Sequence, residues 1–381
     1  MPEHTLVLQN ADIVLPQAVI RGWAAAVDGR IVEIGEGRPP ERGLDLEGDT
    51  LIPGLVELHT DHLESHYAPR PKVRWHPLGA VLAYDAQIAA SGITTVFDSL
   101  RAGVDVDGGG LGGELMQLAG AIDEARRAGL FRCEHLTHLR CEVPSPDVVD
   151  TVRAFVERFP VGLISLMDHT PGQRQFRDLD KYFVYYGGKT GKSAEEIEAA
   201  VAMKQDFNAE RSAVNRPALV GIARERAIPL ASHDDTTVEE VRQSVEEGVV
   251  LAEFPTTLES ALACREHGIT VMMGAPNLIR GGSHSGNVAA EALAQEGVLD
   301  IFSSDYVPAS LLMAAFDLPR RVPSISLSEA ILTVTRNPAQ ATGLDDRGEI
   351  APGKRADLVR VRVAGDMPVV RQVWRGGERT A

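Results

Sequence analysis

The sequence Leu51-Ile-Pro-Gly-Leu-Val-Glu-Leu-His59 is an apolar run that leads into the polar residues Thr60-Asp61-His62. Such a run predicts a buried strand with its chemically active residues at the carboxyl end. In a strand, residues i and i+2 point to the same side, so His59 and Asp61 can bind one metal ion together. The segment therefore predicts a sheet protein with a metal site at its strand ends.

Seven further apolar runs follow this one, and helical patterns such as Glu114–Ala128 and Val238–Glu247 lie between them. The eight expected strands are Leu51–His59, Ile93–Asp98, Cys133–Cys141, Val161–Asp168, Ile228–His233, Val249–Phe254, Ile269–Met273 and Asp300–Ser304. Strands that alternate with helices and end in polar residues favour a closed (β/α)8 TIM-type barrel over an open doubly wound sheet.

The two ends of the chain resemble each other in pattern and differ from the middle. Short alternating runs occur at Thr5–Leu15, Trp23–Val27 and Arg30–Ile34, and again at Asp357–Val363 and Val369–Trp374. Strands from both ends can pair in one small domain, which brings the termini together. We therefore expect residues 1–52 and 345–381 to form a small β-sandwich and residues 53–344 to form the barrel.

Composition restricts the class of partner. The net charge of −16 over 381 residues argues against binding to nucleic acid or to acidic membranes. No apolar run reaches the roughly 18 residues that a membrane span needs, and the first residues lack a signal-peptide pattern. The three cysteines form no disulfide framework. These features predict a cytoplasmic protein with a small-molecule substrate.

Almost every expected strand ends in an imidazole or a carboxylate. These residues are His59, Asp61, His138, Glu142, Asp168, His169, His233, Asp234, Asp235, Glu253 and Asp305. Singly, each has a structural interpretation: a buried histidine is usually hydrogen-bonded, and Asp234 or Asp235 suits the N-cap of the next helix. Together, at the carboxyl ends of barrel strands, they predict a metal centre for Zn²⁺, Mn²⁺ or Fe²⁺.

The same residues carry a resemblance to a known family. Leu51–His59, Asn337–Ala341 and Gly348–Leu358 resemble the amidohydrolase superfamily. Finer motifs, in order along nearly the whole chain, resemble its PhnM family of phosphonate degradation. They are His59–Leu63, Pro69–Val73, Ser91–Thr95, His138–Glu142, Ser165–Phe176, Ala231–Asp235, Glu253–Thr257, Gly274–Asn277, Arg280–Asn287 and Ser303–Tyr306.

This resemblance implies a diphosphatase that removes pyrophosphate from α-D-ribose 1-methylphosphonate 5-triphosphate. It implies two divalent ions, with zinc expected and manganese or iron as alternatives. The expected ligands are His59, Asp61, Glu142, His169, His233 and Asp305. Asp305 is also the expected catalytic residue, which accepts the proton of the attacking water.

The chain departs from the superfamily pattern in two places. Asp61 stands where the superfamily usually has the second histidine of His-x-His, and Asp168-His169 stands where it often has a carboxylated lysine. We therefore expect Glu142 as the bridging carboxylate, with Asp168 and Glu253 as alternatives.

An anionic triphosphate on an acidic protein needs local positive charge and hydrogen-bond donors. The expected substrate-binding residues are Arg70, Lys72, Arg140, Arg174, Arg280, Ser283, His284 and Asn287. The last three lie in the glycine-rich stretch Gly281–Asn287, whose backbone N–H groups can bind phosphate oxygens. The long connection Phe176–Arg216 is either a lid or a contact of a homo-oligomer.

Two other functions remain open from the sequence. A C–N bond hydrolase of the same superfamily, a cyclic amidase or a deaminase, would have the same metal chemistry. The basic residues of Arg70–Arg74 favour a phosphorylated substrate over an amide. A non-catalytic metal-binding scaffold of a phosphonate-degrading assembly is the other alternative, and the complete set of carboxylates at the strand ends argues against it.

Overall fold

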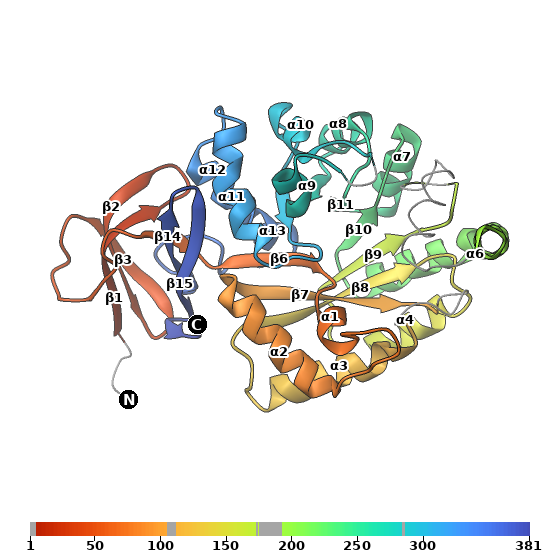
Figure 1. Ribbon diagram of the computed structural model, residues 1–381, viewed down its shortest axis with the longest axis horizontal. Coiled ribbons are helices and arrows are strands. Elements are labelled where there is room, and N and C mark those ends of the chain that lie inside the picture. The colour runs from red at the N-terminus through yellow and green to blue at the C-terminus, as the bar shows by residue number, and fades with distance from the viewer. Residues whose placement is uncertain (1–4, 105–111, 173, 175–192, 284–285) are drawn as a thin grey trace.

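The computed structural model describes residues 5–104, 112–172, 174, 193–283 and 286–381. One of its two sheets has eight parallel strands that neighbour one another in chain order. They are β6 (Leu55–Thr60), β7 (Ile93–Ala102), β8 (Glu134–Glu142), β9 (Leu163–Met167), β10 (Leu230–His233), β11 (Leu251–Glu253), β12 (Thr270–Gly274) and β13 (Ile301–Ser303). The Asp305 N–H donates to the His59 carbonyl at 3.0 Å, which joins the last strand to the first. The predicted (β/α)8 barrel, nearly closed, is confirmed (Figure 1).

Helices surround the strands and supply the outer half of the core (Figure 1). They are α1 (Leu63–Tyr67), α2 (Pro77–Ala90), α3 (Leu115–Arg127), α4 (Val148–Val156), α6 (Ala194–Glu225), α7 (Val238–Glu247), α8 (Leu258–Glu266), α9 (Ala275–Arg280), α10 (Ala290–Gln295), α11 (Ser310–Arg321), α12 (Leu327–Leu332) and α13 (Arg336–Ala341). Among the described residues, none of the helices has the length and apolarity needed to cross a bilayer.

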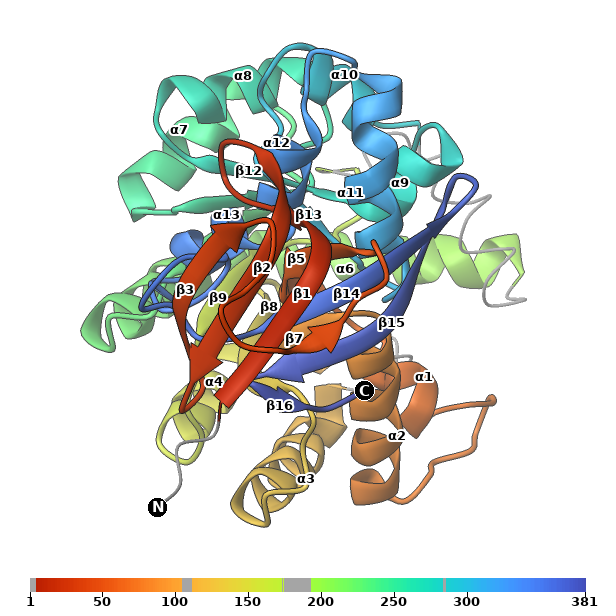
Figure 2. The ribbon, with the colours of Figure 1, turned by 90° about the vertical axis from the view of Figure 1, so that its left-hand side faces the viewer.

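Strands from both ends of the chain form a second sheet beside the barrel, here called the terminal sheet (Figures 1 and 2). They are β1 (Thr5–Val14), β2 (Val19–Val27), β3 (Arg30–Glu36), β4 (Leu44–Asp45), β5 (Thr50–Pro53), β14 (Leu358–Ala364), β15 (Met367–Arg375) and β16 (Glu378–Arg379). Leu8, Ile13, Leu51 and Trp374 are buried in its own apolar cluster. Because β14 pairs with β5, the two ends of the chain hold this sheet together.

The expected single strand Leu51–His59 is divided at Gly54 into β5 of the terminal sheet and β6 of the barrel. A Cβ atom on Gly54 would lie 2.2 Å from Oγ1 of Thr94, so only glycine fits where the chain passes between the sheets. The connection Phe176–Arg216 is described only in part. Its residues 176–192 lie outside the described residues, and the rest belongs to α6, which continues to Glu225.

A buried ion-pair cluster fastens α2 to the barrel wall. His135 of β8 lies 3.2 Å from Asp85 of α2 through Nε2 and 3.0 Å from Asp98 of β7 through Nδ1. Burial opposes the charge on His135, but Asp98 and Asp85 outweigh it and raise its pKa to about 9. The charged imidazole therefore holds a helix and two strands together.

We expect His135→Gln to lower the free energy of unfolding at pH 6 by about 3–5 kcal/mol, the usual cost of breaking a buried ion pair. Because the folded-state pKa is raised, this stabilisation is complete below the ordinary value of 6.5 and is lost as the pH rises through about 9. Denaturant unfolding at pH 6 and at pH 9.5 measures both values. A difference between wild type and variant that stays constant with pH would contradict the charged state of His135.

Candidate metal centre

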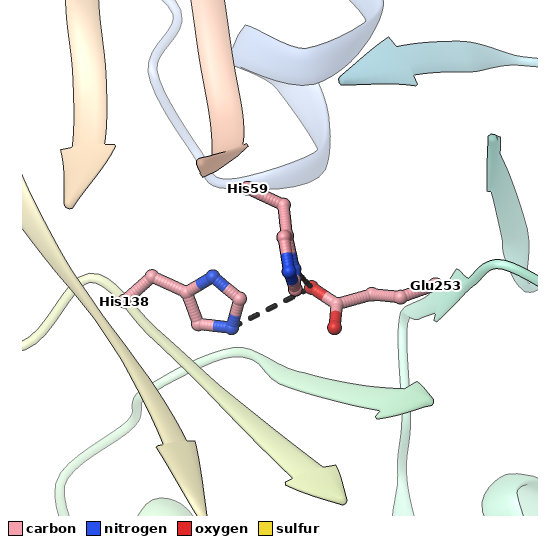
Figure 3. Close-up of side chains that lie close together, drawn as sticks. All are labelled: His59, His138 and Glu253. Carbon is pink, nitrogen blue, oxygen red and sulfur yellow. Dashed lines mark ion pairs between the residues drawn. The ribbon is translucent and has the colours of Figure 1, made fainter. Parts of the chain in front are cut away.

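Three buried side chains from different strands converge at the carboxyl end of the barrel (Figure 3). His59 is the penultimate residue of β6, His138 lies in β8 and Glu253 is the last residue of β11. Oε1 of Glu253 lies 3.2 Å from Nδ1 of His59 and 3.5 Å from Nε2 of His138. All three side chains are at most 1% exposed, so the carboxylate is held among imidazoles and away from solvent.

The unpaired atoms of this group fit a divalent cation. Among the described residues, neither Nδ1 of His59 nor Oε1 of Glu253 has a hydrogen-bond partner, because their short contact lacks hydrogen-bond geometry. Burial lowers the pKa of His59 well below its usual value and that of His138 to about 3. Neutral imidazole is the form that binds metals, and buried atoms without partners are otherwise costly. A metal ion in this place would satisfy both.

A second group of possible ligands lies next to the first and contacts it through Glu253. The group comprises His169, His233 and Asp234, whose ligand atoms lie within 4.8 Å of one another. Nδ1 of His233 lies 3.0 Å from Oε2 of Glu253, and the rings of His59 and His233 stack at 5.6 Å. Burial lowers the pKa of His233 to about 4 and raises that of Asp234 to about 7. One oxygen of Glu253 therefore faces each group, the arrangement that a bridging carboxylate needs.

The other expected ligands surround these two groups. Oε1 of Glu142 accepts a hydrogen bond of 2.8 Å from Nδ1 of His169. Burial opposes ionisation of Glu142, but His169 and Arg101 hold its pKa far below the usual range. Glu142 thus fixes the ring of His169, the role of a partner that orients a ligand.

Asp305 and Asp61 face each other where the barrel closes. The Asp61 N–H donates to the Asp305 carbonyl at 3.3 Å. Burial, together with the charge of Asp61, raises the pKa of Asp305 to about 7. A carboxyl group with such a pKa can exchange a proton near neutral pH.

Three residues that follow barrel strands adopt the left-handed backbone region. Asp234, Phe254 and Asp305 have φ values of 57°, 57° and 54°. Aspartate tolerates this region, but a bulky phenylalanine is seldom found there, and such residues cluster at functional sites. The Phe254 ring lies 5.0 Å from His59 and 5.3 Å from His233 between centroids and forms an apolar wall of the site. Asp234 does not cap α7, because Thr237 does so with a capping box.

The expected basic residues lie in three different environments. Arg140 is half-buried, 3.5 Å from Asp61 and at the centre of the site. Arg174 is only 6% exposed and donates to Asp235 at 2.5 Å and to the His233 carbonyl at 2.8 Å, so it supports the end of β10. Arg70 and Lys72 are exposed in the loop after α1.

The glycine-rich stretch lies after α9. Arg280 is exposed at the end of that helix, and Ser283 and Asn287 are half-buried. His284 lies outside the described residues. Asp168, one alternative for the bridging ligand, accepts a 2.5 Å hydrogen bond from Asn208 of α6. It therefore faces α6, whereas Glu253 faces the histidines.

Sequence reasoning missed or undervalued several of these residues. His138 belongs to the polar residues that predict the metal centre but not to the expected ligands, although it alternates with Arg140 and Glu142 at a spacing of two and so points to the same side. Glu57 shares its face with His59 by the same rule; its carboxylate accepts from the N–H groups of His59 at 2.7 Å and Ser304 at 2.6 Å. The alternation with a period of two within each strand is the sequence signal that could have identified both residues.

A protein of Escherichia coli (strain K12) named alpha-D-ribose 1-methylphosphonate 5-triphosphate diphosphatase is 46% identical over 380 residues, 98% of this chain and 100% of that protein. This chain belongs to the PhnM family of amidohydrolases. The sequence profile of the Amidohydrolase family matches residues 264–381.

Solved structures share the fold at low identity. The PhnM-family chain superposes on N-acetyl-D-glucosamine-6-phosphate deacetylase from Mycobacterium smegmatis with a TM-score of 0.60 and 18% identity, covering 99% of this chain and 100% of that one. It matches the A. niger ochratoxinase with a TM-score of 0.63 and 14% identity, covering 99% and 95%. Membership makes the chain a hydrolase of a superfamily that typically depends on metal ions, and the two ligand groups agree with that.

Proposed function

We propose that this enzyme cleaves α-D-ribose 1-methylphosphonate 5-triphosphate to the 5-phosphate and pyrophosphate, as the name of its E. coli relative states for that protein. The observation that carries the proposal is the Glu253 carboxylate held between two groups of possible histidine ligands, in a chain 46% identical to that diphosphatase. The enzyme is proposed to be cytoplasmic. Its site is proposed to bind zinc, with manganese or iron as alternatives. The identity of the metal follows from elemental analysis of the purified protein.

The proposed ligands are His59, Asp61, His169, His233 and Asp305, with Glu142 as expected from the sequence. We add His138 and Glu253, because their buried atoms meet at the centre. Divalent ions bound there supply Lewis acidity and lower the pKa of water toward neutrality. This chain's residues do the rest: Asp305 accepts the proton of the attacking water, and Glu142 keeps His169 in orientation.

The basic residues are proposed to neutralise the negative charge of the substrate phosphates. Arg140 lies beside Asp61 and can neutralise the phosphate that reacts. Arg70, Lys72, Arg280, Ser283, His284 and Asn287 are proposed to bind the rest of the phosphate chain, and Arg174 to position His233. The negative charge that develops on departing pyrophosphate is where such groups contribute most to the rate.

Product analysis tests this function against its rivals. Metal-loaded enzyme incubated with the ribosyl triphosphate should release pyrophosphate and leave the 5-phosphate. Release of ammonia or an amine from a cyclic amide, without pyrophosphate from the triphosphate, would instead identify a C–N bond hydrolase. If the purified, metal-loaded protein converted neither substrate, the result would support a non-catalytic metal-binding scaffold.

The exposed loop after α1 is the test of phosphate recognition. We expect Arg70→Ala and Lys72→Ala each to lower kcat/KM for the triphosphate by at least about tenfold, because one charge-assisted contact is worth about 1.5–3 kcal/mol. Metal content should not change, and the loss should shrink for substrates with fewer phosphates. Arg38→Ala, which removes an exposed charge in the loop after β3, is the matched control. Equal losses with tri-, di- and monophosphates would make the loop structural.

A further inference from the structure

A small pocket adjoins the metal centre on the side of α6. Glu142 and His169 form its inner wall and connect it with the proposed ligands. Arg101 from the end of β7 and Lys204 from α6 provide two cationic side chains, and Phe207 lies one helical turn after Lys204. The pocket was not expected from the sequence, which gave neither Arg101 nor Lys204 a role.

The structure shows why α6 presents these residues to the pocket. Nε2 of Gln205 donates to the Pro171 carbonyl at 3.0 Å, and Nδ2 of Asn208 donates to Asp168 at 2.5 Å and to Thr170 at 3.0 Å. These bonds dock α6 on the residues that follow β9 (Figure 1). Lys204 and Phe207 are spaced i and i+3, so both side chains lie on one face of the helix. The docked helix therefore forms a wall of the site.

The charges of the pocket suit an anion next to the metals. Arg101 is 27% exposed, and its Nη2 lies 3.3 Å from Oε1 of Glu142. That carboxylate is also bonded to His169, so the two cations outnumber the single carboxylate that lines the pocket. Phe207 and Pro144 add apolar surface beside the cations. A tetrahedral phosphorus oxyanion joined to an apolar or sugar group matches this combination.

We propose that Arg101 and Lys204 form a subsite for a phosphorus oxyanion of the substrate, separate from the loop of Arg70 and Lys72. The subsite rests on the proposed function, since it names the part of the enzyme that binds one end of the triphosphate substrate. Two groups of that substrate share the required chemistry: the departing pyrophosphate and the methylphosphonate ester at the other end of the ribose.

The test measures binding of inorganic pyrophosphate and of methylphosphonate to the metal-loaded enzyme by calorimetry. Lys204→Met keeps the length of the side chain and removes its charge, and we expect it to weaken one of the two probes by about tenfold. The affected probe identifies which end of the substrate the subsite holds. Lys204→Arg should restore most of the binding. Arg211→Met removes a charge from an exposed position of the same helix and should bind both probes as wild type does.

The steady-state readout separates the subsite from the function. With the triphosphate, Lys204→Met should raise KM about tenfold and change kcat less. Wild type that releases pyrophosphate, with both probes bound equally by Lys204→Met and Arg211→Met, would overturn the subsite and leave the function intact. Wild type that releases no pyrophosphate, with a probe still weakened by Lys204→Met, would overturn the function and support an oxyanion site.

Discussion

His233→Ala is expected to lose bound metal and to lower kcat/KM for the triphosphate by more than about a hundredfold. His233 contacts Glu253 at 3.0 Å and Asp234 at 3.4 Å, so its imidazole joins the carboxylate of one ligand group to the other. Loss of a ligand displaces the ion that lowers the pKa of water. Even the substitution of a residue that only orients a ligand typically lowers metal affinity or activity by about 10–100-fold. Elemental analysis after gel filtration, in parallel with steady-state kinetics, measures both effects.

The matched control is His267→Ala, an exposed histidine at the C-cap of α8. It should keep full metal content and full activity. Thermal unfolding of both variants shows whether His233→Ala remains folded, since its side chain is buried. A folded His233→Ala enzyme with wild-type metal content and full activity would show that the metal centre lies elsewhere.

Asp305→Asn is expected to lower kcat by about 10²–10⁴-fold, the usual contribution of a general acid or base. Its carboxyl group is the proposed proton acceptor, and burial raises its pKa to about 7. Because the base must be ionised, wild-type kcat should fall as the pH drops through about 7 or below. The variant, which has no carboxyl group to ionise there, should lose that acidic limb.

Asp366→Asn is the control for this substitution. Asp366 is an exposed aspartate that pairs with Arg320 and lies in the turn between β14 and β15, outside the barrel strands. It should keep both the rate and the pH profile of wild type. An Asp305→Asn enzyme that retained the acidic limb would assign the proton to another group, for which Asp234, also with a pKa of about 7, is the alternative.

The sequence by itself determined the barrel and the end of it at which the chemistry lies. Apolar runs of strand length alternating with helical periods fix a parallel sheet, because each strand buries both of its faces. The residues at the carboxyl ends of those runs, such as His59 and His233, must then gather at one rim. Local pattern is enough for these conclusions because they depend only on residue type and on position along a strand.

Only the tertiary structure decided which of the polar residues meet. From the sequence, Glu142 was the expected bridging carboxylate, with Asp168 and Glu253 as alternatives. Glu253 is the last residue of β11, and His59 lies near the end of β6. Closure of the barrel directs Glu253 to the histidines, while docking of α6 turns Asp168 toward Asn208.

The small pocket has the same origin. Arg101 and Lys204 are separated by about a hundred residues and come together only because Asn208 and Gln205 hold α6 against the residues after β9. Distances between side chains of different strands and helices depend on barrel closure and helix docking. The local periodicity of the sequence contains no information about either. Residue type and spacing thus identify the candidate site residues at the rim of the barrel, and tertiary packing decides which of them contact one another.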